Sequence, residues 1–152
     1  MRYWLMKSEP EEFSIDDLVK HKKTAWFGVR NYQARNFMMK DMKIGDQVLF
    51  YHSNANPPAI VGIAEVAAVA YPDPTQFERN HKHFDPASDP ASPRWDMVDI
   101  QYVRAFAAPL SLDSLRMEKK LAGMALLQKG SRLSVQPVTK GEWEHILKLA
   151  AG

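Results

Sequence analysis

The stretch TAWFGVRNYQARNFM, from Thr24 to Met38, combines residue types that a hydrophobic core seldom uses together. Within fifteen residues it holds aromatic side chains, one glycine, two arginines and three side-chain amides. A packed core gains little from arginines and amides, because each buried polar group needs a partner. A pocket that stacks a flat ring and holds a phosphate uses all of these residue types. We therefore expect this stretch to form part of a ligand site.

Local patterns around this stretch predict short helices and a buried strand. Ser14 with Asp17 three residues later resembles a capping box, which predicts a helix that ends near His21. Asn31 is a good N-cap for a second helix with apolar residues at helical spacing. The segment Arg2–Lys7 reads as a strand with apolar residues on both faces, which is typical of a strand covered on both sides.

The rest of the chain alternates strands with short helices. The predicted strands are Gln47–His52, Ile60–Tyr71, Met97–Arg104 and Arg132–Gln136. The predicted helices or turns are Ser111–Met117, Lys120–Gln128 and a C-terminal helix that opens with the capping-box pair Thr139 and Glu142. Regular βαβ alternation is absent, so the pattern favours an α+β fold: a small, mainly antiparallel mixed β barrel of about five or six strands with short flanking helices.

The segment Pro72–Pro93 differs in composition from its surroundings. It carries five of the ten prolines together with several Asp and Ser residues. Long irregular connections of this kind are usually functional or mobile. We interpret it as an insertion within one domain, because no linker or internal repeat divides the chain, and we expect a single domain over residues 1–152.

Composition excludes several functional classes. The 152 residues are 45% hydrophobic and 25% charged, which suits an ordinary globular core. The absence of cysteine excludes disulfides, thiolate nucleophiles and cysteine-ligated zinc. No apolar run is long enough for a membrane span, and the N-terminus does not read as a secretory signal. We therefore expect a protein of the cytoplasm, or of the nucleus in a eukaryote, with no membrane partner.

Charge is concentrated in one part of the chain. The formal net charge is +2, but residues 20–43 alone carry +6 and the remainder sums to −4. A local basic patch suits an anionic partner, although a solvated helix face is the alternative. Arg30 and Arg35 flank the N-cap Asn31, where helix N–H groups favour a phosphate. With Lys22 and Lys23 they are the predicted phosphate-binding residues.

Two tryptophans lie outside periodic runs and are candidates for base stacking. Trp26 precedes Gly28, and Trp95 ends the proline-rich segment just before a strand. An aromatic ring on a loop can stack a nucleobase, although either indole can equally plug the end of a barrel. Trp4 and Trp143 lie on strand and helix faces, so we interpret them as core residues.

Catalytic and metal signals are weak. His52 and Ser53 are adjacent at a strand end, so their side chains point to opposite faces and form a poor nucleophile–base pair. His81, His83 and Asp85 form an H-x-H-x-D pattern that reads better as a solvated polar loop than as a metal site. We predict no metal and no cofactor.

Several motifs occur in one order along the whole chain: YWLMKSEP (Tyr3–Pro10), W-x-G-V-R-N-Y-Q-A-R-N (Trp26–Asn36), GDQVLFYHS (Gly45–Ser53), IVGIAEV (Ile60–Val66) and RLSVQPV (Arg132–Val138). Together they resemble the EVE domain family. The resemblance implies a PUA-like pseudo-barrel related to the YTH and ASCH domains, whose members bind RNA or modified bases, with EVE domains linked to modified cytosine in DNA.

The resemblance also implies site residues. Trp26 matches the first tryptophan of the aromatic cage that holds a flipped base, and Trp95 resembles the second. Ser8 and Ser53 would lie near the pocket, with Asn31 and Tyr32 at its wall. We add His52 as a polar contact to the base edge, as with Ser8, Asn31 and Ser53. The expected function is non-enzymatic reading of a modified nucleobase, with nucleic acid as the partner.

Two other functions remain open from the sequence. One is an enzyme that acts on a modified base or nucleotide, with His52 or Glu65 as proton carrier. The other is a small-molecule sensor that uses the same cavity without nucleic acid. The sequence does not distinguish DNA from RNA, and it does not identify the modification.

Overall fold

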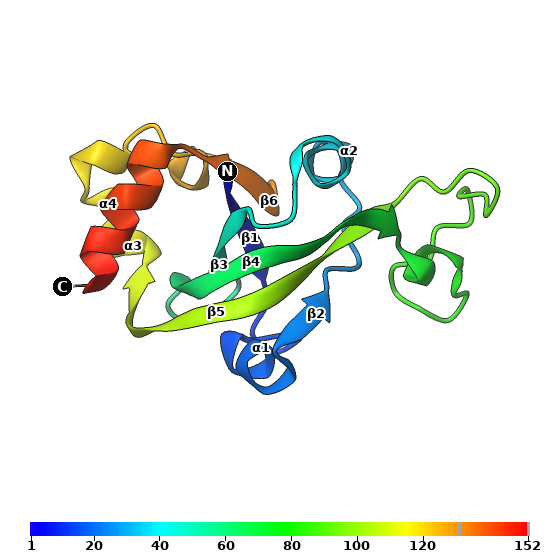
Figure 1. The fold of residues 1–152 in the computed structure, drawn as a ribbon, viewed down its shortest axis with the longest axis horizontal. Coiled ribbons are helices and arrows are strands. Elements are labelled where there is room, and N and C mark those ends of the chain that lie inside the picture. Colours follow the sequence, from blue (N-terminus) through cyan, green and yellow to red (C-terminus); the bar gives the residue numbers. More distant parts are fainter. Residues whose placement is uncertain (131, 152) are drawn as a thin grey trace.

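The computed structural model describes residues 1–130 and 132–151, and its centre is one six-stranded mixed sheet (Figure 1). The strand order is β2-β5-β4-β3-β1-β6. The strands are β1 (Tyr3–Ser8), β2 (Lys23–Ala25), β3 (Gln47–His52), β4 (Ala59–Pro72), β5 (Asp96–Ser111) and β6 (Val135–Val138). The domain predicted over 1–152 thus includes two residues, 131 and 152, that lie outside the described part.

The register explains why the sheet is mixed and open. β1 pairs in parallel with β3, while the other four neighbouring pairs are antiparallel. β2 and β6 lie at opposite ends of the strand order and do not pair, so the sheet curls without closing. The predicted α+β pseudo-barrel with about six strands is confirmed. The sheet places the ends of β1 and β3 side by side, since Ser8 is in register with His52.

Both faces of the sheet are buried, as the apolar pattern of β1 predicts. Trp4 and Met6 pack into one core cluster with Trp26 and Phe50, whereas Leu5 packs into a second cluster on the other side of the strand. Trp4, Leu5 and Met6 are fully buried. The interpretation of Trp4 and Trp143 as core residues is confirmed, because both are buried.

Four α-helices flank the sheet: α1 (Ile15–His21), α2 (Tyr32–Asn36), α3 (Leu112–Arg116) and α4 (Lys140–Ala151). The Ser14–Asp17 capping box forms, and Thr139 and Glu142 exchange the corresponding pair of hydrogen bonds before α4. Asn31 caps α2 by accepting the Ala34 N–H. The predicted second helix is shorter than expected, because after Asn36 it widens into the π-helical turn Phe37–Asp41.

The predicted boundaries differ from the structure in three places. The segment 120–128, predicted as a helix or turn, is divided into two 3-10 turns, Lys119–Leu121 and Ala125–Leu127. The last strand begins at Val135, because its pairing with β1 runs from Val135 to Val138. β4 and β5 reach further than predicted and form a long antiparallel pair, which carries residues 73–95 away from the body of the sheet at one end (Figure 1).

Residues 73–95 are ordered by buried polar contacts instead of forming a free loop. They contain the 3-10 helix Pro74–Phe77, and the side chains of Asp73 and Gln76 are fully buried. Gln76 Nε2 donates to the carbonyl oxygens of Asp73 and Trp95, and its Oε1 accepts the Trp95 N–H. The two ends of the segment are therefore joined through one glutamine.

Candidate nucleic-acid interface

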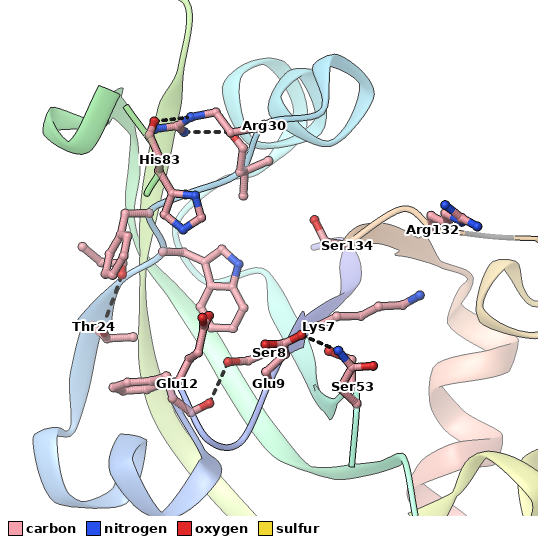
Figure 2. A pocket seen from close by; sticks show the side chains of 17 residues that line it. Lys7, Ser8, Glu9, Glu12, Thr24, Arg30, Ser53, His83, Arg132 and Ser134 are labelled. Atoms are coloured by element: carbon pink, nitrogen blue, oxygen red, sulfur yellow. Dashed lines mark hydrogen bonds between the residues drawn. The ribbon is translucent and has the colours of Figure 1, made fainter. Parts of the chain in front are cut away.

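A cavity of about 590 Å³ opens where the ends of β1 and β3 meet the segment that follows β2 (Figure 2). Its volume lies in the range of roughly 300–1,000 Å³ that small-molecule sites occupy. Residues that line it are Lys7, Ser8, Glu9, Glu12, Phe13, Thr24, Ala25, Trp26, Phe27, Gly28, Val29, Arg30, Ser53, Asn54, His83, Arg132 and Ser134. The first seven residues of the Thr24–Met38 stretch, from Thr24 to Arg30, thus form part of the cavity wall.

Trp26 supplies the largest aromatic surface of the cavity and is held firmly. Its backbone N–H donates to the Val98 carbonyl at 2.8 Å, which extends the pairing of β2 with β5 by one residue. The Phe50 ring meets its indole edge-on, with centroids 5.6 Å apart. The side chain is only 8% exposed, so it serves both as core and as cavity lining. Trp26 is therefore a core residue that also lines the cavity, and its stacking on a base stays a prediction.

Hydroxyl groups at the strand ends provide polar contacts in the same cavity. Ser8 Oγ donates to the Phe13 carbonyl at 2.6 Å, so its proton is used and its lone pairs remain available as acceptors. The Ser53 N–H donates to the Ser8 carbonyl at 3.0 Å, which fixes the two serines beside each other. Thr24 and Ser134 also line the cavity. Ser8 and Ser53 thus line the cavity, and their role toward a base stays a prediction.

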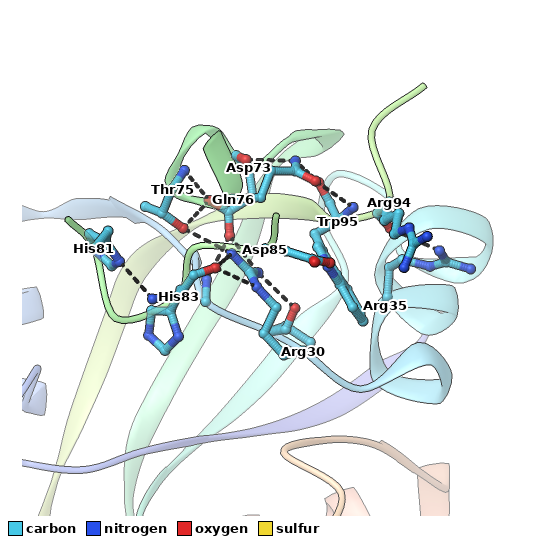
Figure 3. Close-up of polar contacts among 12 residues, drawn as sticks. Arg30, Arg35, Asp73, Thr75, Gln76, His81, His83, Asp85, Arg94 and Trp95 are labelled. Atoms are coloured by element: carbon cyan, nitrogen blue, oxygen red, sulfur yellow. Dashed lines mark hydrogen bonds and ion pairs between the residues drawn. The ribbon is translucent and has the colours of Figure 1, made fainter. Parts of the chain in front are cut away.

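Arg30 joins the cavity wall to the 73–95 segment (Figure 3). Its guanidinium donates five hydrogen bonds to four acceptors: two to the His83 carbonyl, and one each to the Val29 carbonyl, Asp73 Oδ2 and Thr75 Oγ1. A guanidinium has five N–H donors, so all of them are engaged inside the protein. Asp73, which is fully buried, neutralises its charge at 3.1 Å.

Asp73 also fixes the turn between Trp26 and Arg30. Its Oδ2 accepts the Gly28 N–H at 2.7 Å. Burial alone would raise the pKa of Asp73, but hydrogen bonds from Gly28, Thr75 and Arg30 outweigh it and hold the pKa below the ordinary value of 3.8. Gly28 has φ +87, and a Cβ there would lie 2.6 Å from His83 Nε2. The position therefore needs glycine both for its backbone and for the imidazole packed against it.

Trp95 does not face Trp26 across the cavity, so the predicted two-indole sandwich is wrong. Trp95 is 5% exposed and does not line the cavity. Its ring stacks on Tyr32 with centroids 4.8 Å apart, and its Nε1–H donates to Asp85 at 2.7 Å. The Arg30 guanidinium lies 5.4 Å from its ring centroid. The physical reason is that the 73–95 segment folds back on itself and uses this indole as its own core.

Three other predicted contacts to the base also lie outside the cavity lining. Asn31 is an exposed helix cap, and Tyr32 is half exposed with its ring against Trp95. His52 Nε2 accepts the Ile15 N–H at 3.0 Å, so the lone pair of this nitrogen is used in a hydrogen bond to the first residue of α1. Burial lowers the pKa of His52, against the opposing charge of Asp16, and keeps the neutral form that can accept this hydrogen bond.

The same geometry bears on the enzyme alternative. Its two suggested proton carriers, His52 and Glu65, do not line the cavity. Glu65 lies on β4 opposite Gln47, whose side-chain amide it accepts at 3.4 Å. A general acid or base must reach the reacting group by hydrogen bond or through one water, so the position of both residues outside the cavity lining gives no support to these two as proton carriers.

The four predicted phosphate-binding residues have different environments. Lys22 and Lys23 are exposed where β2 begins, next to the cavity residue Thr24. Arg35 stacks over Tyr32 at 4.7 Å and donates to the Arg94 carbonyl and to Asn36 Oδ1. Arg30 lines the cavity, but its donors are occupied, so the structure contradicts a bidentate phosphate contact there. For the other three the role stays a prediction.

Sequence reasoning missed three aromatic residues of the cavity: Phe13, Phe27 and His83. Phe27 is half exposed and lies near His81 and His83, with centroid distances of 5.8 and 6.2 Å. Its place in the Thr24–Met38 stretch, directly after Trp26, was the available signal. No local signal marks His83, which Arg30 places through its carbonyl.

The H-x-H-x-D segment is occupied by internal contacts. The His83 N–H donates to His81 Nδ1 at 3.1 Å, and Asp85 accepts the Trp95 indole N–H. Burial first, and then the positive charges of Arg30, His81 and Lys82, lower the pKa of His83. Among residues 1–130 and 132–151 no group of three His, Cys, Asp or Glu side chains could hold a metal ion. Nor is any helix in that part long and apolar enough to cross a membrane.

An open mixed sheet with a hydroxyl- and aromatic-lined cavity at its strand ends defines a PUA-like domain of the α+β class. An ASCH protein from Zymomonas mobilis shares this fold at a TM-score of 0.56 and 15% identity, over 98% of this chain and 99% of that chain. The EVE domain model matches residues 2–149, so the chain belongs to the EVE domain family.

Relatives support the assignment over nearly the whole chain. Thymocyte nuclear protein 1 from Rattus norvegicus is 46% identical over 166 residues, which cover 97% of this chain and 73% of that protein. A protein from Pseudomonas syringae has a crystal structure with TM-score 0.94 and 47% identity, over 97% of this chain and 99% of the other. Human THYN1, solved in complex with 5-methylcytosine-containing DNA, has TM-score 0.91 and 42% identity, over 100% and 99%.

Proposed function

We propose that this chain reads a modified base, methylated cytosine in DNA, by holding the extruded base in the cavity lined by Trp26. The observation that carries the proposal is this cavity, with one indole and several hydroxyls, in a chain 42% identical to a protein crystallised with 5-methylcytosine-containing DNA. Binding without turnover fits the cavity, because the acid–base residues suggested for an enzyme lie outside its lining.

The energetics set what the cavity must supply. Extruding a base from a duplex costs a few kcal/mol of unstacking and unpairing. Stacking on an aromatic ring returns about 1–3 kcal/mol per base. The indole of Trp26 therefore offsets much of the cost, and hydrogen bonds from the base edge to the Ser8, Ser53 and Ser134 groups add specificity. We expect contacts from the exposed Lys22 and Lys23, which precede Thr24 in the chain, to flanking phosphates to supply the remainder.

The test compares two tryptophans that are buried to a similar extent. Trp26→Leu keeps an apolar side chain in the core but removes the stacking surface, whereas Trp95→Leu removes an indole that does not line the cavity. Binding is measured by fluorescence anisotropy with matched oligonucleotides that contain cytosine, 5-methylcytosine or 5-hydroxymethylcytosine. We expect Trp26→Leu to lose about 1–3 kcal/mol of preference for the modified base and Trp95→Leu to retain it.

Folding is verified for both variants by thermal denaturation, because each removes core volume. A Trp26→Leu protein that folds and still prefers the methylated oligonucleotide would show that the indole does not stack the base. Titration of the wild-type protein with oligonucleotide at two salt concentrations also tests the alternative of a small-molecule sensor. A nucleic-acid reader should bind more weakly at higher salt, whereas a site for a neutral metabolite should show little salt dependence. The compartment, cytoplasmic or nuclear, stays a prediction.

A further inference from the structure

Lys7 occupies an unusual position at the end of β1. Its N–H donates to the Ser134 carbonyl at 2.9 Å, and β1 pairs it with Tyr51 on β3. Successive side chains of a strand point to opposite faces. Met6 belongs to the cluster that contains Trp26, whereas Leu5 and Tyr51 belong to the other cluster. The Lys7 side chain therefore rises on the Leu5 and Tyr51 side, where its ammonium lies 5.9 Å from the Tyr51 ring centroid.

Arg132 lies on the same side of the cavity. Figure 2 shows Lys7 and Arg132 pointing away from the wall that His83 and Arg30 form. Arg132 is exposed, and both residues line the cavity.

These cations lack a buried counter-charge. Among residues 1–130 and 132–151, neither Lys7 nor Arg132 takes part in an ion pair. Burial lowers the pKa of the half-buried Lys7 ammonium. An ammonium that is partly removed from water without a partner is held at a cost that a bound anion would relieve.

The two carboxylates of the cavity lining differ in their partners. Glu12 pairs with Lys82 from the 73–95 segment, whereas Glu9 accepts the neutral side-chain amide of Asn54 and keeps its negative charge. On the opposite wall Arg30 is neutralised by Asp73 and has no free donor. The two walls of the cavity therefore differ in charge. At Arg30 and His83 the arginine is neutralised by Asp73, whereas on the other wall Lys7 and Arg132 have no ion-pair partner among the described residues.

We propose that Lys7 and Arg132 each bind a backbone phosphate of the strand whose base enters the cavity. The inference rests on the proposed function in taking the anion to be a nucleic-acid phosphodiester. It adds a phosphate-binding surface to the one predicted at Lys22 and Lys23, on the far side of the cavity from Arg30. The base would then be held between strand-end hydroxyls and the Trp26 indole while the backbone lies on the β1 side.

The test measures how binding depends on salt, because each phosphate contact contributes about 0.9 to the slope of log K against log [salt] for duplex DNA. Lys7→Met keeps the aliphatic stem and removes the charge, and Lys7→Arg keeps the charge. Arg132→Gln is the second charge deletion, and Lys40→Gln is the control, since Lys40 is an exposed lysine outside the cavity lining. Affinity for methylated and unmethylated duplexes is measured between 50 and 200 mM salt.

We expect Lys7→Met and Arg132→Gln each to lower the slope by about 0.9, which corresponds to roughly a threefold smaller change in affinity over this range. Both duplexes should lose affinity alike, Lys7→Arg should restore the wild-type slope, and Lys40→Gln should leave it unchanged. A folded Lys7→Met protein with the wild-type slope overturns the inference, as does a slope that falls equally in the Lys40→Gln control.

The outcome is separable from that of the proposed function. If the wild-type protein binds methylated and unmethylated duplexes equally, base reading fails, yet a reduced slope in Lys7→Met still supports the phosphate surface. If the wild-type protein prefers the methylated duplex and neither charge deletion changes the slope, base reading stands and the phosphate surface is refuted.

Discussion

Replacing Asp73 with asparagine tests the junction between the cavity and the 73–95 segment. Asp73 Oδ2 accepts from the Gly28 N–H and from Arg30, and Oδ1 accepts from the Thr75 N–H and hydroxyl at 2.8 and 2.6 Å. An amide has one oxygen and one NH₂ group. In either orientation of the asparagine, its NH₂ group therefore faces two groups that already donate to that position in the wild type. The substitution also removes the negative charge that neutralises Arg30.

The expected size follows from these contacts. Leaving buried polar groups unsatisfied costs about 1–3 kcal/mol each, and breaking a buried ion pair by removing one partner costs about 3–5 kcal/mol. Because the contributions overlap at one carboxylate, we expect Asp73→Asn to lower the free energy of unfolding by roughly 3–5 kcal/mol. Urea denaturation at neutral pH measures this, with Asp113→Asn as the control, since Asp113 is exposed in a 4.0 Å surface pair and should change stability by under about 1 kcal/mol.

The pH dependence supplies a second test of the same reasoning. The folded pKa of Asp73 lies below its ordinary value of 3.8, so its contribution to stability is complete above that pH and is lost as the pH falls through the folded pKa. The difference between wild type and Asp73→Asn should therefore be constant from pH 5 to 7 and shrink below about pH 4. A difference under about 1 kcal/mol at pH 7, or one that grows in acid, would refute the assignment of Asp73 as an ionised clamp.

Two further changes test local geometry. In His52→Gln the side-chain oxygen can still accept the Ile15 N–H. Because the folded pKa of His52 is lowered, this residue should make the wild-type protein less stable as the pH falls below about 6.5, and the variant should lack this contribution. The urea midpoints at pH 7 and pH 5 should therefore differ less in the variant than in the wild type. Gly28→Ala should cost about 1–3 kcal/mol, because φ is +87 and the new Cβ would meet His83; a loss under about 0.5 kcal/mol, or unchanged His83 imidazole NMR shifts, would contradict this.

Much of the fold follows from local rules that act within a few residues. The Ser14–Asp17 box, the Asn31 cap and the alternation in β1 each depend on neighbouring residues alone, and each is present in the structure. Gly62 also behaves as its isolated place in a strand suggests, because a Cβ there would lie 2.5 Å from the Arg104 carbonyl oxygen. Such features are predictable because the sequence separation between the partners is short or the residue type is permissive.

The site was less predictable because its partners are far apart in sequence. Trp95 has no periodic neighbours, as Trp26 has none, and that shared property suggested a shared role. What separates them is that Trp95 stacks on Tyr32, 63 positions earlier, and donates to Asp85 within its own segment. A long segment that builds its own small core removes aromatic residues from the site, and nothing in local composition distinguishes that outcome from an exposed loop.

The same lesson applies to charge, and it changes which residues should be expected to meet an anion. The net charge of +6 over residues 20–43 includes Arg30 as a full positive charge. Asp73, 43 residues later in the chain, neutralises Arg30, so this arginine adds no free positive charge to the cavity wall. Lys7 lies outside that stretch and borders the acidic residue Glu9, but its ammonium has no ion-pair partner among residues 1–130 and 132–151. The charge available to a ligand is the charge left after internal pairing and weighted by desolvation, so one half-buried lysine can contribute more to phosphate binding than a fully paired arginine in the middle of a basic motif.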